Sequence, residues 1–144
     1  GRKIPSILDY QLHVAKESMY NTPPCFSIFT CMLTMEWLKE LGGVKEIEKR
    51  NKAKASLLYA EIDRNSLFEG TAAVEDRSIM NPTFILKNDE LNADFLAKSI
   101  EAGINGIKGH RSVGGFRASM YNALEIESVQ VLVDLMKKFE RVNG

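Results

Sequence analysis

Apolar residues recur every three to four positions in four stretches of this sequence, which is the period of an amphipathic α-helix. The first stretch follows Asn21-Thr22-Pro23-Pro24, where Asn and Thr are N-cap types and proline fits the first helical turn. It ends at Gly42-Gly43, as a helix C-cap does. The pattern therefore predicts a long helix between these signals and further helices over residues 44–63, 89–103 and 125–142.

Two other stretches alternate between apolar and polar residues, which is typical of β-strands. They are SIMNPTFILK (78–87) and GFRASMYN (115–122). Pro82 predicts an edge position or a bulge in the first of them. PSILDYQLHVAK (5–16) has weak periodicity and is interpreted as a short strand followed by a loop.

Helices interleaved with strands predict an α/β class, in the form of an α+β sandwich whose short sheet is covered by helices. The expected boundary lies at Gly42-Gly43, which gives domains over residues 1–43 and 44–144. The first domain has a long apolar helix and little sequence to cover it. We therefore expect residues 1–43 to be the end of a larger domain, and the start at GRK without Met to mark a fragment.

The composition narrows the function classes. Lys plus Arg and Asp plus Glu number 19 each among 144 residues, so no net charge attracts a nucleic acid or a membrane surface. KEIEKRNKAK (45–54) is interpreted as a solvated helix face. The two His and two Cys show no metal-ligand spacing. Cys25 and Cys31 are expected to be buried or half-buried reduced thiols, and no targeting segment is visible, which predicts a cytoplasmic protein.

GHRSVGGFRAS (109–119) carries the candidate anion-binding chemistry. Arg117 faces away from the apolar side of its strand, and its planar guanidinium suits a carboxylate. His110 and Arg111 precede it across glycines, which let a backbone bend and approach a ligand. The alternatives are an Arg117 paired with a carboxylate of the protein and a glycine pair that only makes a turn. The residues alone leave both open.

The start of the first long helix is a second candidate anion site. A helix N-terminus can hold a phosphate, and Asn21 and Thr22 add side-chain donors. Pro23 and Pro24 remove two backbone N–H groups, so plain helix capping is the interpretation that the residues favour.

These stretches together resemble the phosphoserine aminotransferase family, class V enzymes of fold type I that use pyridoxal 5'-phosphate in serine biosynthesis. The matching pieces include SMYNTPPCFSIF, EWLKELGG, RSIMNPTF and KGHRSVGGFRASMYNA, and they run over essentially the whole chain. The resemblance implies a C-terminal portion of a cytoplasmic homodimer that transfers an amino group between glutamate and 3-phosphohydroxypyruvate, giving 2-oxoglutarate and phosphoserine.

The resemblance also implies roles for individual residues. Arg117 would bind the substrate α-carboxylate, and His110 and Arg111 the substrate phosphate in the neighbouring subunit's site. Asn21 and Thr22 would contact the cofactor phosphate across the dimer interface. The family's Schiff-base lysine lies upstream of PSILDY, so no catalytic residue is expected in this chain, which would be inactive alone. The alternative is a stand-alone, non-catalytic module that binds phosphorylated metabolites.

Overall fold

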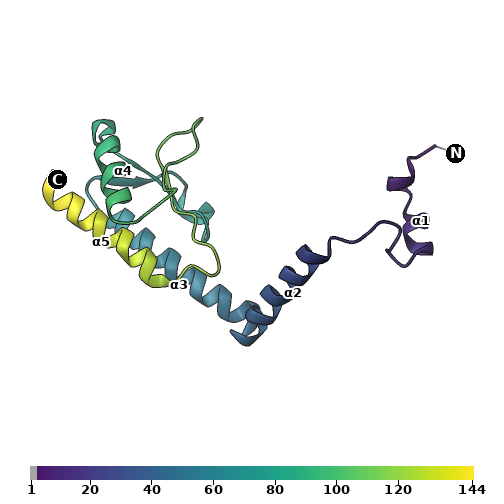
Figure 1. Cartoon of the computed structure of the whole chain (residues 1–144). Helices are drawn as coiled ribbons and strands as arrows, with labels where there is room; N and C mark the ends of the chain where they lie inside the picture. Colours follow the sequence, from purple (N-terminus) through teal and green to yellow (C-terminus); the bar gives the residue numbers. More distant parts are fainter. Residues whose placement is uncertain (1–2) are drawn as a thin grey trace. The chain divides into compact units, whose positions relative to one another are not determined.

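The computed structural model describes residues 3–144, and Figure 1 shows their path. The chain divides into two compact units, Gly1–Leu41 and Gly42–Gly144. Within the described residues, no helix has the length and apolar content that a bilayer crossing requires.

The first unit is entirely helical in its regular elements. It contains the 3-10 helix η1 (Ser6–Leu8), then α1 (Tyr10–Ala15) and α2 (Cys25–Glu40). The strand expected within residues 5–16 is therefore wrong. Asp9 caps α1, because its side chain accepts a hydrogen bond from the backbone N–H of Gln11 at 3.0 Å. A helix of six residues has fewer than two turns and is too short to show a helical period.

The long helix α2 is confirmed, but it begins later than its cap signals indicate. Its N-cap is Pro24, and no side chain caps it. A residue that precedes proline is driven out of the α-helical region, so Thr22 and Pro23 cannot be helical and the first turn starts at Cys25. Capping by Asn21 or Thr22 is thus wrong. Beyond the helix, Gly42 has a left-handed φ of 112°, which fits the predicted glycine stop.

Every residue of α2 has some exposure in this unit, and none is buried. Large apolar side chains remain accessible around the helix, with Phe26 82% and Trp37 38% exposed. The expectation of buried or half-buried thiols is wrong as well, since Cys25 and Cys31 are free and exposed. The cause is the same: none of the described residues of the unit packs over this helix closely enough to bury any part of it.

The second unit combines three helices with a three-stranded antiparallel sheet, which confirms the predicted α+β class. The elements are α3 (Gly43–Arg64), β1 (Phe68–Gly70), η2 (Val74–Asp76), β2 (Thr83–Leu86), η3 (Asp89–Leu91), α4 (Asn92–Glu101), β3 (Phe116–Arg117) and α5 (Ile126–Asn143). The strand order is β1-β2-β3, with Phe68 opposite Leu86 and Thr83 opposite Arg117.

Pro82 does not place its strand at the sheet edge. β2 is the central strand, and Pro82 lies just before it. Its missing N–H is therefore not needed by the ladder, whereas its carbonyl oxygen accepts a hydrogen bond from Ala118 N–H at 2.9 Å. The predicted edge position is wrong because proline at the start of a strand costs no ladder bond, and the uninterrupted register of β2 with β1 and β3 shows no bulge within that strand either.

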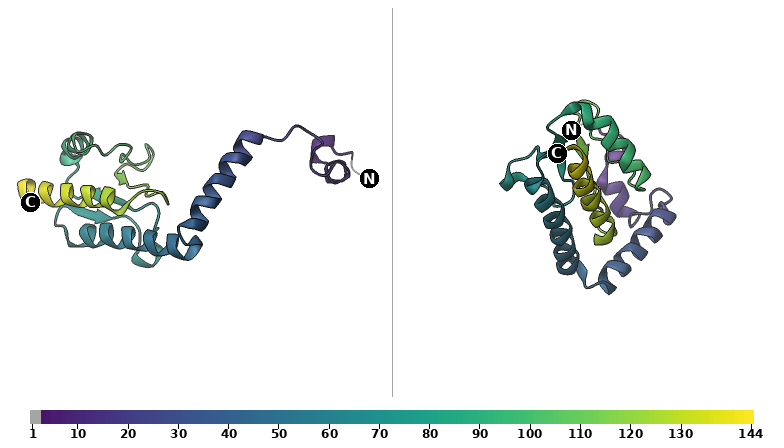
Figure 2. Two further views of the ribbon diagram at one scale, coloured as in Figure 1. Left: turned by 60° about the horizontal axis from the view of Figure 1, so that its bottom comes forward. Right: turned by 90° about the vertical axis from the view of Figure 1, so that its left-hand side faces the viewer.

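The core lies on one face of the sheet, where α3, α4 and α5 contribute side chains. Five phenylalanines form its centre, and Phe95 makes edge-on contacts with three of them at centroid distances of 5.0 to 5.2 Å. Helices α3 and α5 pack against each other, as both views of Figure 2 show. The five are Phe68, Phe84, Phe95, Phe116 and Phe139.

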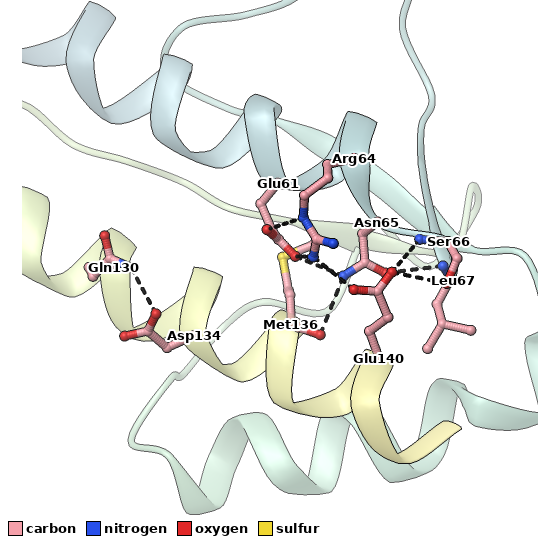
Figure 3. Close-up of polar contacts among 9 residues, drawn as sticks. All are labelled: Glu61, Arg64, Asn65, Ser66, Leu67, Gln130, Asp134, Met136 and Glu140. Atoms are coloured by element: carbon pink, nitrogen blue, oxygen red, sulfur yellow. Dashed lines mark hydrogen bonds and ion pairs between the residues drawn. The ribbon is translucent and has the colours of Figure 1, made fainter. Parts of the chain in front are cut away.

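A polar network joins the C-terminal ends of α3 and α5 (Figure 3). The Arg64 guanidinium bridges Glu61 at 2.6 Å and Glu140 at 2.8 Å. The Asn65 amide donates to the same Glu61 carboxylate at 2.8 Å, and Ser66 N–H donates to Glu140 at 2.7 Å. Glu61 is 3% exposed, so its buried carboxylate needs these partners.

Candidate functional site

The glycine-rich segment folds as a loop closed at its base by a short hairpin. Lys108 pairs with Phe116 as an isolated bridge, and Gly109 N–H donates to Gly115 O at 2.9 Å. Arg117 N–H donates to Ile107 O at 2.8 Å. The loop over residues 109–115 is therefore anchored directly to β3, the strand that carries Arg117.

Two glycines at this base are required by close backbone approach. A Cβ on Gly109 would lie 2.2 Å from Gly114 O, and one on Gly115 would lie 2.8 Å from Phe84 O. Gly115 also has a φ of +63°, which L side chains rarely adopt. In this structure the glycines let the chain approach itself, which explains their positions without any ligand.

His110 opens the turn in the loop, and Arg111 follows it. The His110 carbonyl accepts from Val113 N–H at 2.9 Å and Gly114 N–H at 2.8 Å. Its Nδ1 accepts from Ser112 N–H at 3.3 Å and lies 2.6 Å from Ser112 Oγ. A ring whose Nδ1 accepts carries its proton on Nε2 when neutral. His110 and Arg111 are both exposed, so their charged or donor groups face solvent.

Arg117 lies on the exposed face of β3, as its alternation with Phe116 predicts. Phe116 and Met120 are buried at 4% and 2% exposure, whereas Arg117 and Tyr121 are exposed. Among the described residues, no carboxylate lies within 4.0 Å of the Arg117 guanidinium. Of the alternatives left open by the sequence, pairing with a carboxylate of this chain is therefore not observed.

Arg117 borders a cavity of about 520 Å³, a volume within the usual range for small-molecule sites. The cavity is lined by Leu58 of α3, by four residues of α5, by residues 102–107, and by residues 117–121 and Leu124 of the segment that follows, which include Ser119 and Tyr121. Arg117 is the only charged residue among the described residues that line it. His110 and Arg111 do not contribute to the lining.

Asn21 and Thr22 lie in the first unit, in the segment that precedes α2. Both are exposed. Within residues 3–144, neither side chain has a hydrogen-bond partner, and the first intrahelical bond of α2 runs from Ile28 N–H to Pro24 O at 3.1 Å. Their amide and hydroxyl groups are thus free to bind an oxyanion such as a phosphate.

Sequence reasoning missed two residues of α3 that bear on the cavity. Lys54, assigned above to a solvated face, is 2% exposed, and Asn51 is 5% exposed. Burial lowers the pKa of Lys54, and Glu125 opposes this shift. The signal was present in the spacing, because 51 and 54 fall between Ile47 and Leu58 on the helix face that the apolar residues define.

A family model described as aminotransferase class-V matches residues 3–132. The chain therefore belongs to the class-V aminotransferase family.

Relatives within that family carry a more specific name. The chain is 62% identical over 140 residues to a phosphoserine aminotransferase of Flavobacterium psychrophilum, covering 97% of this chain and 39% of the relative. A phosphoserine aminotransferase structure from Bacillus circulans subsp. alkalophilus superposes with a TM-score of 0.91 at 43% identity, covering 98% of this chain and 39% of that one.

A third comparison concerns a cofactor-bound structure. Phosphoserine aminotransferase from Trichomonas vaginalis, crystallised with pyridoxal phosphate bound, has a TM-score of 0.83 at 38% identity and is matched over 93% of this chain and 39% of its own. The chain thus spans about two fifths of the length of these relatives. Within this span the resemblance inferred from the motifs is confirmed.

Proposed function

We propose that this chain is the C-terminal part of a phosphoserine aminotransferase, which transfers an amino group between phosphoserine and 2-oxoglutarate, yielding 3-phosphohydroxypyruvate and glutamate. The observation that carries the proposal is Arg117: its guanidinium has no acidic partner in the described part of the chain and borders a cavity that holds no other charged side chain. Family membership and 62% identity to a named relative support the same conclusion.

In this proposal Arg117 binds the carboxylate that both substrates of the transfer carry. Two parallel N–H donors match the two carboxylate oxygens, and such a charge-assisted pair is stronger than a hydrogen bond between neutral groups. Anchoring one end of a short substrate fixes the reacting carbon relative to the rest of the site, which is a main source of rate enhancement.

His110 and Arg111 bind the substrate phosphate. Both side chains are exposed at one end of an anchored loop and neither lines the Arg117 cavity. This arrangement suits a role at the site of a neighbouring subunit, so the proposal includes a homodimer. A phosphate dianion favours an arginine and a second hydrogen-bond donor, which the Nε2–H of His110 supplies.

Asn21 and Thr22 fit the phosphate of the cofactor pyridoxal 5'-phosphate. The side-chain donors of both residues are exposed and have no partner among the described residues. Both residues precede α2, whose first turn carries the partial positive charge of the helix dipole. Pyridoxal phosphate supplies the electron sink for the amino transfer when bound. Asn21 and Thr22 would orient it by holding its phosphate, and they take no part in the chemistry.

The domain assignment completes the proposal. Residues 1–43 would be the end of the larger, cofactor-binding domain and residues 44–144 the small C-terminal domain. The exposed apolar residues of α2 fit a helix that the rest of that domain covers. The chain alone would then be inactive. Two exposed free thiols fit a cytoplasmic protein.

The test compares the chain with the complete protein that contains it. We expect the complete protein to form glutamate from phosphoserine and 2-oxoglutarate, whereas residues 1–144 bind phosphoserine too weakly for titration calorimetry to detect. Absence of amino transfer by the complete protein would contradict the proposed function. Tight, stoichiometric binding of phosphoserine by residues 1–144 would instead support a stand-alone module that binds phosphorylated metabolites.

A further inference from the structure

The segment that joins β3 to α5 forms one wall of the Arg117 cavity. Its first part is tied to the residues before β2: Ala118 N–H donates to Pro82 O at 2.9 Å, and Met120 N–H donates to Met80 O at 2.8 Å. Its second part, Tyr121–Leu124, leaves the sheet and closes a turn in which Leu124 N–H donates to Tyr121 O at 3.0 Å. Tyr121 and Leu124 both line the cavity.

Two side chains of α3 donate hydrogen bonds to this turn. The Lys54 ammonium donates to Tyr121 O at 2.7 Å and to Leu124 O at 3.0 Å. One helical turn earlier, the Asn51 amide donates to the Asn122 side-chain oxygen at 2.8 Å. Three hydrogen bonds thus hold three of the four residues of the turn, which lies beyond the end of the strand ladder.

Burying a lysine in this space carries a desolvation penalty. Lys54 is 2% exposed, and among the described residues no carboxylate lies within 4.0 Å of its ammonium. An unbranched apolar side chain would fill the same volume without the desolvation cost of a charge. What the lysine adds is a pair of charge-assisted hydrogen bonds, because an ammonium has three N–H donors and Nζ donates to both carbonyl oxygens at once.

We propose that Lys54 is a positioning residue, assisted by Asn51, that fixes the Tyr121–Leu124 wall of the Arg117 cavity and thereby the placement of substrate against Arg117. The proposal rests on the proposed function of that cavity. Lys54 acts through the main chain and is not itself placed in contact with substrate. Loss of Lys54 should therefore change the placement of substrate and with it the KM. Loss of a purely structural residue would change the stability of the protein alone.

The experiment uses the complete protein and the variant Lys54→Met, which retains the length of the side chain and loses the donors. We expect amide hydrogen exchange over residues 118–125 to become faster. We also expect the KM for phosphoserine to rise roughly tenfold, the equivalent of one charge-assisted hydrogen bond.

The matched control is Glu140→Gln. Glu140 ties α5 to Arg64 and Ser66 in the network of Figure 3, and none of these residues lines the cavity. This variant should lower the thermal midpoint while leaving both the KM and the exchange of residues 118–125 unchanged. A KM that rises equally in both variants would overturn the proposal, because it would follow stability and not the cavity wall.

A second variant tests the proposal in case the Lys54→Met protein does not fold. Asn122→Ala removes the partner of Asn51 at an exposed position, so we expect it to fold, to exchange faster over residues 121–124 and to raise the KM by roughly two- to threefold. If amide hydrogen exchange over residues 121–124 is unchanged in either variant, the proposal is overturned. Wild-type protein without amino transfer contradicts the proposed function, and the exchange data still decide whether Lys54 holds the wall.

Discussion

At the residue scale, the loop that carries His110 and Arg111 depends on two neighbouring glycines with different surroundings. Gly114 and Gly115 both have positive φ values, +80° and +63°. A Cβ on Gly114 would meet nothing within 4 Å, whereas one on Gly115 would lie 2.8 Å from Phe84 O and from Ile85 Cγ2. The same substitution at Gly114 and at Gly115 therefore distinguishes the free-energy cost of a left-handed backbone from that of steric overlap.

We expect Gly115→Ala to destabilise the protein more than Gly114→Ala does. The left-handed conformation costs about 1–2 kcal/mol at either site, and the overlap at Gly115 adds about 1–3 kcal/mol. Urea unfolding of the two variants measures the difference. Equal losses of unfolding free energy would contradict the close approach of Gly115 to β2.

Single residues also show what could be predicted from the sequence. Arg117 was correctly placed on the exposed side of its strand because alternation is a local property that two neighbours, Phe116 and Met120, define. The charge of Lys54 predicts a solvated face, whereas its spacing from Ile47 and Leu58 indicates the buried one that the structure shows. Its acceptors, the carbonyls of Tyr121 and Leu124, lie 67 and 70 residues away in sequence, and no local pattern indicates them.

At the element scale, the joint between α3 and α5 depends on ionised carboxylates. The Ser66 N–H, and after it the Arg64 guanidinium, hold the pKa of Glu140 below its ordinary value of 4.5. A carboxyl group with a lowered pKa stabilises the fold where it is ionised. Its contribution is complete above pH 4.5 and is lost as the pH falls through the lowered value.

We therefore expect the urea midpoint of the wild type to decrease as the pH is lowered from 4.5, and to decrease more steeply than the midpoint of Glu140→Gln. At neutral pH the variant should be the less stable protein, and the two midpoints should converge in acid. Asp63, whose pKa is lowered by hydrogen bonds from Arg77, leaves a residual slope in the variant. Parallel curves for the two proteins would contradict the role given to Glu140.

Elements differed in how well the sequence predicted them. The four long helices were predicted because each shows several turns of apolar periodicity. The six-residue α1 and the three-residue β1 are too short to show a period, and the first was misassigned and the second missed. The place of β2 in the centre of the sheet depends on pairing with β1 and β3, which no local rule determines.

At the scale of the whole molecule, the proposed site residues fall in both compact units: Asn21 and Thr22 in the first, and His110, Arg111 and Arg117 in the second. The residues alone offer a candidate anion site in each unit, but they favour plain capping for Asn21 and Thr22 and leave the role of Arg117 open. Their assignment to a cofactor phosphate, a substrate phosphate and a carboxylate came from the resemblance. The chain spans about two fifths of its named relatives, so the proposed reaction belongs to the complete protein.

The most direct test of the account is the kinetics of Arg117 variants in the complete protein. Losing a charge-assisted pair of roughly 1.5–3 kcal/mol should lower kcat/KM for phosphoserine about ten- to hundredfold in Arg117→Ala. Arg117→Lys, which keeps the charge without the planar fork, should recover part of that loss. Arg50→Ala is the control, since within residues 3–144 Arg50 pairs with Glu46 alone, on the surface of α3. An unchanged kcat/KM in Arg117→Ala would contradict the account.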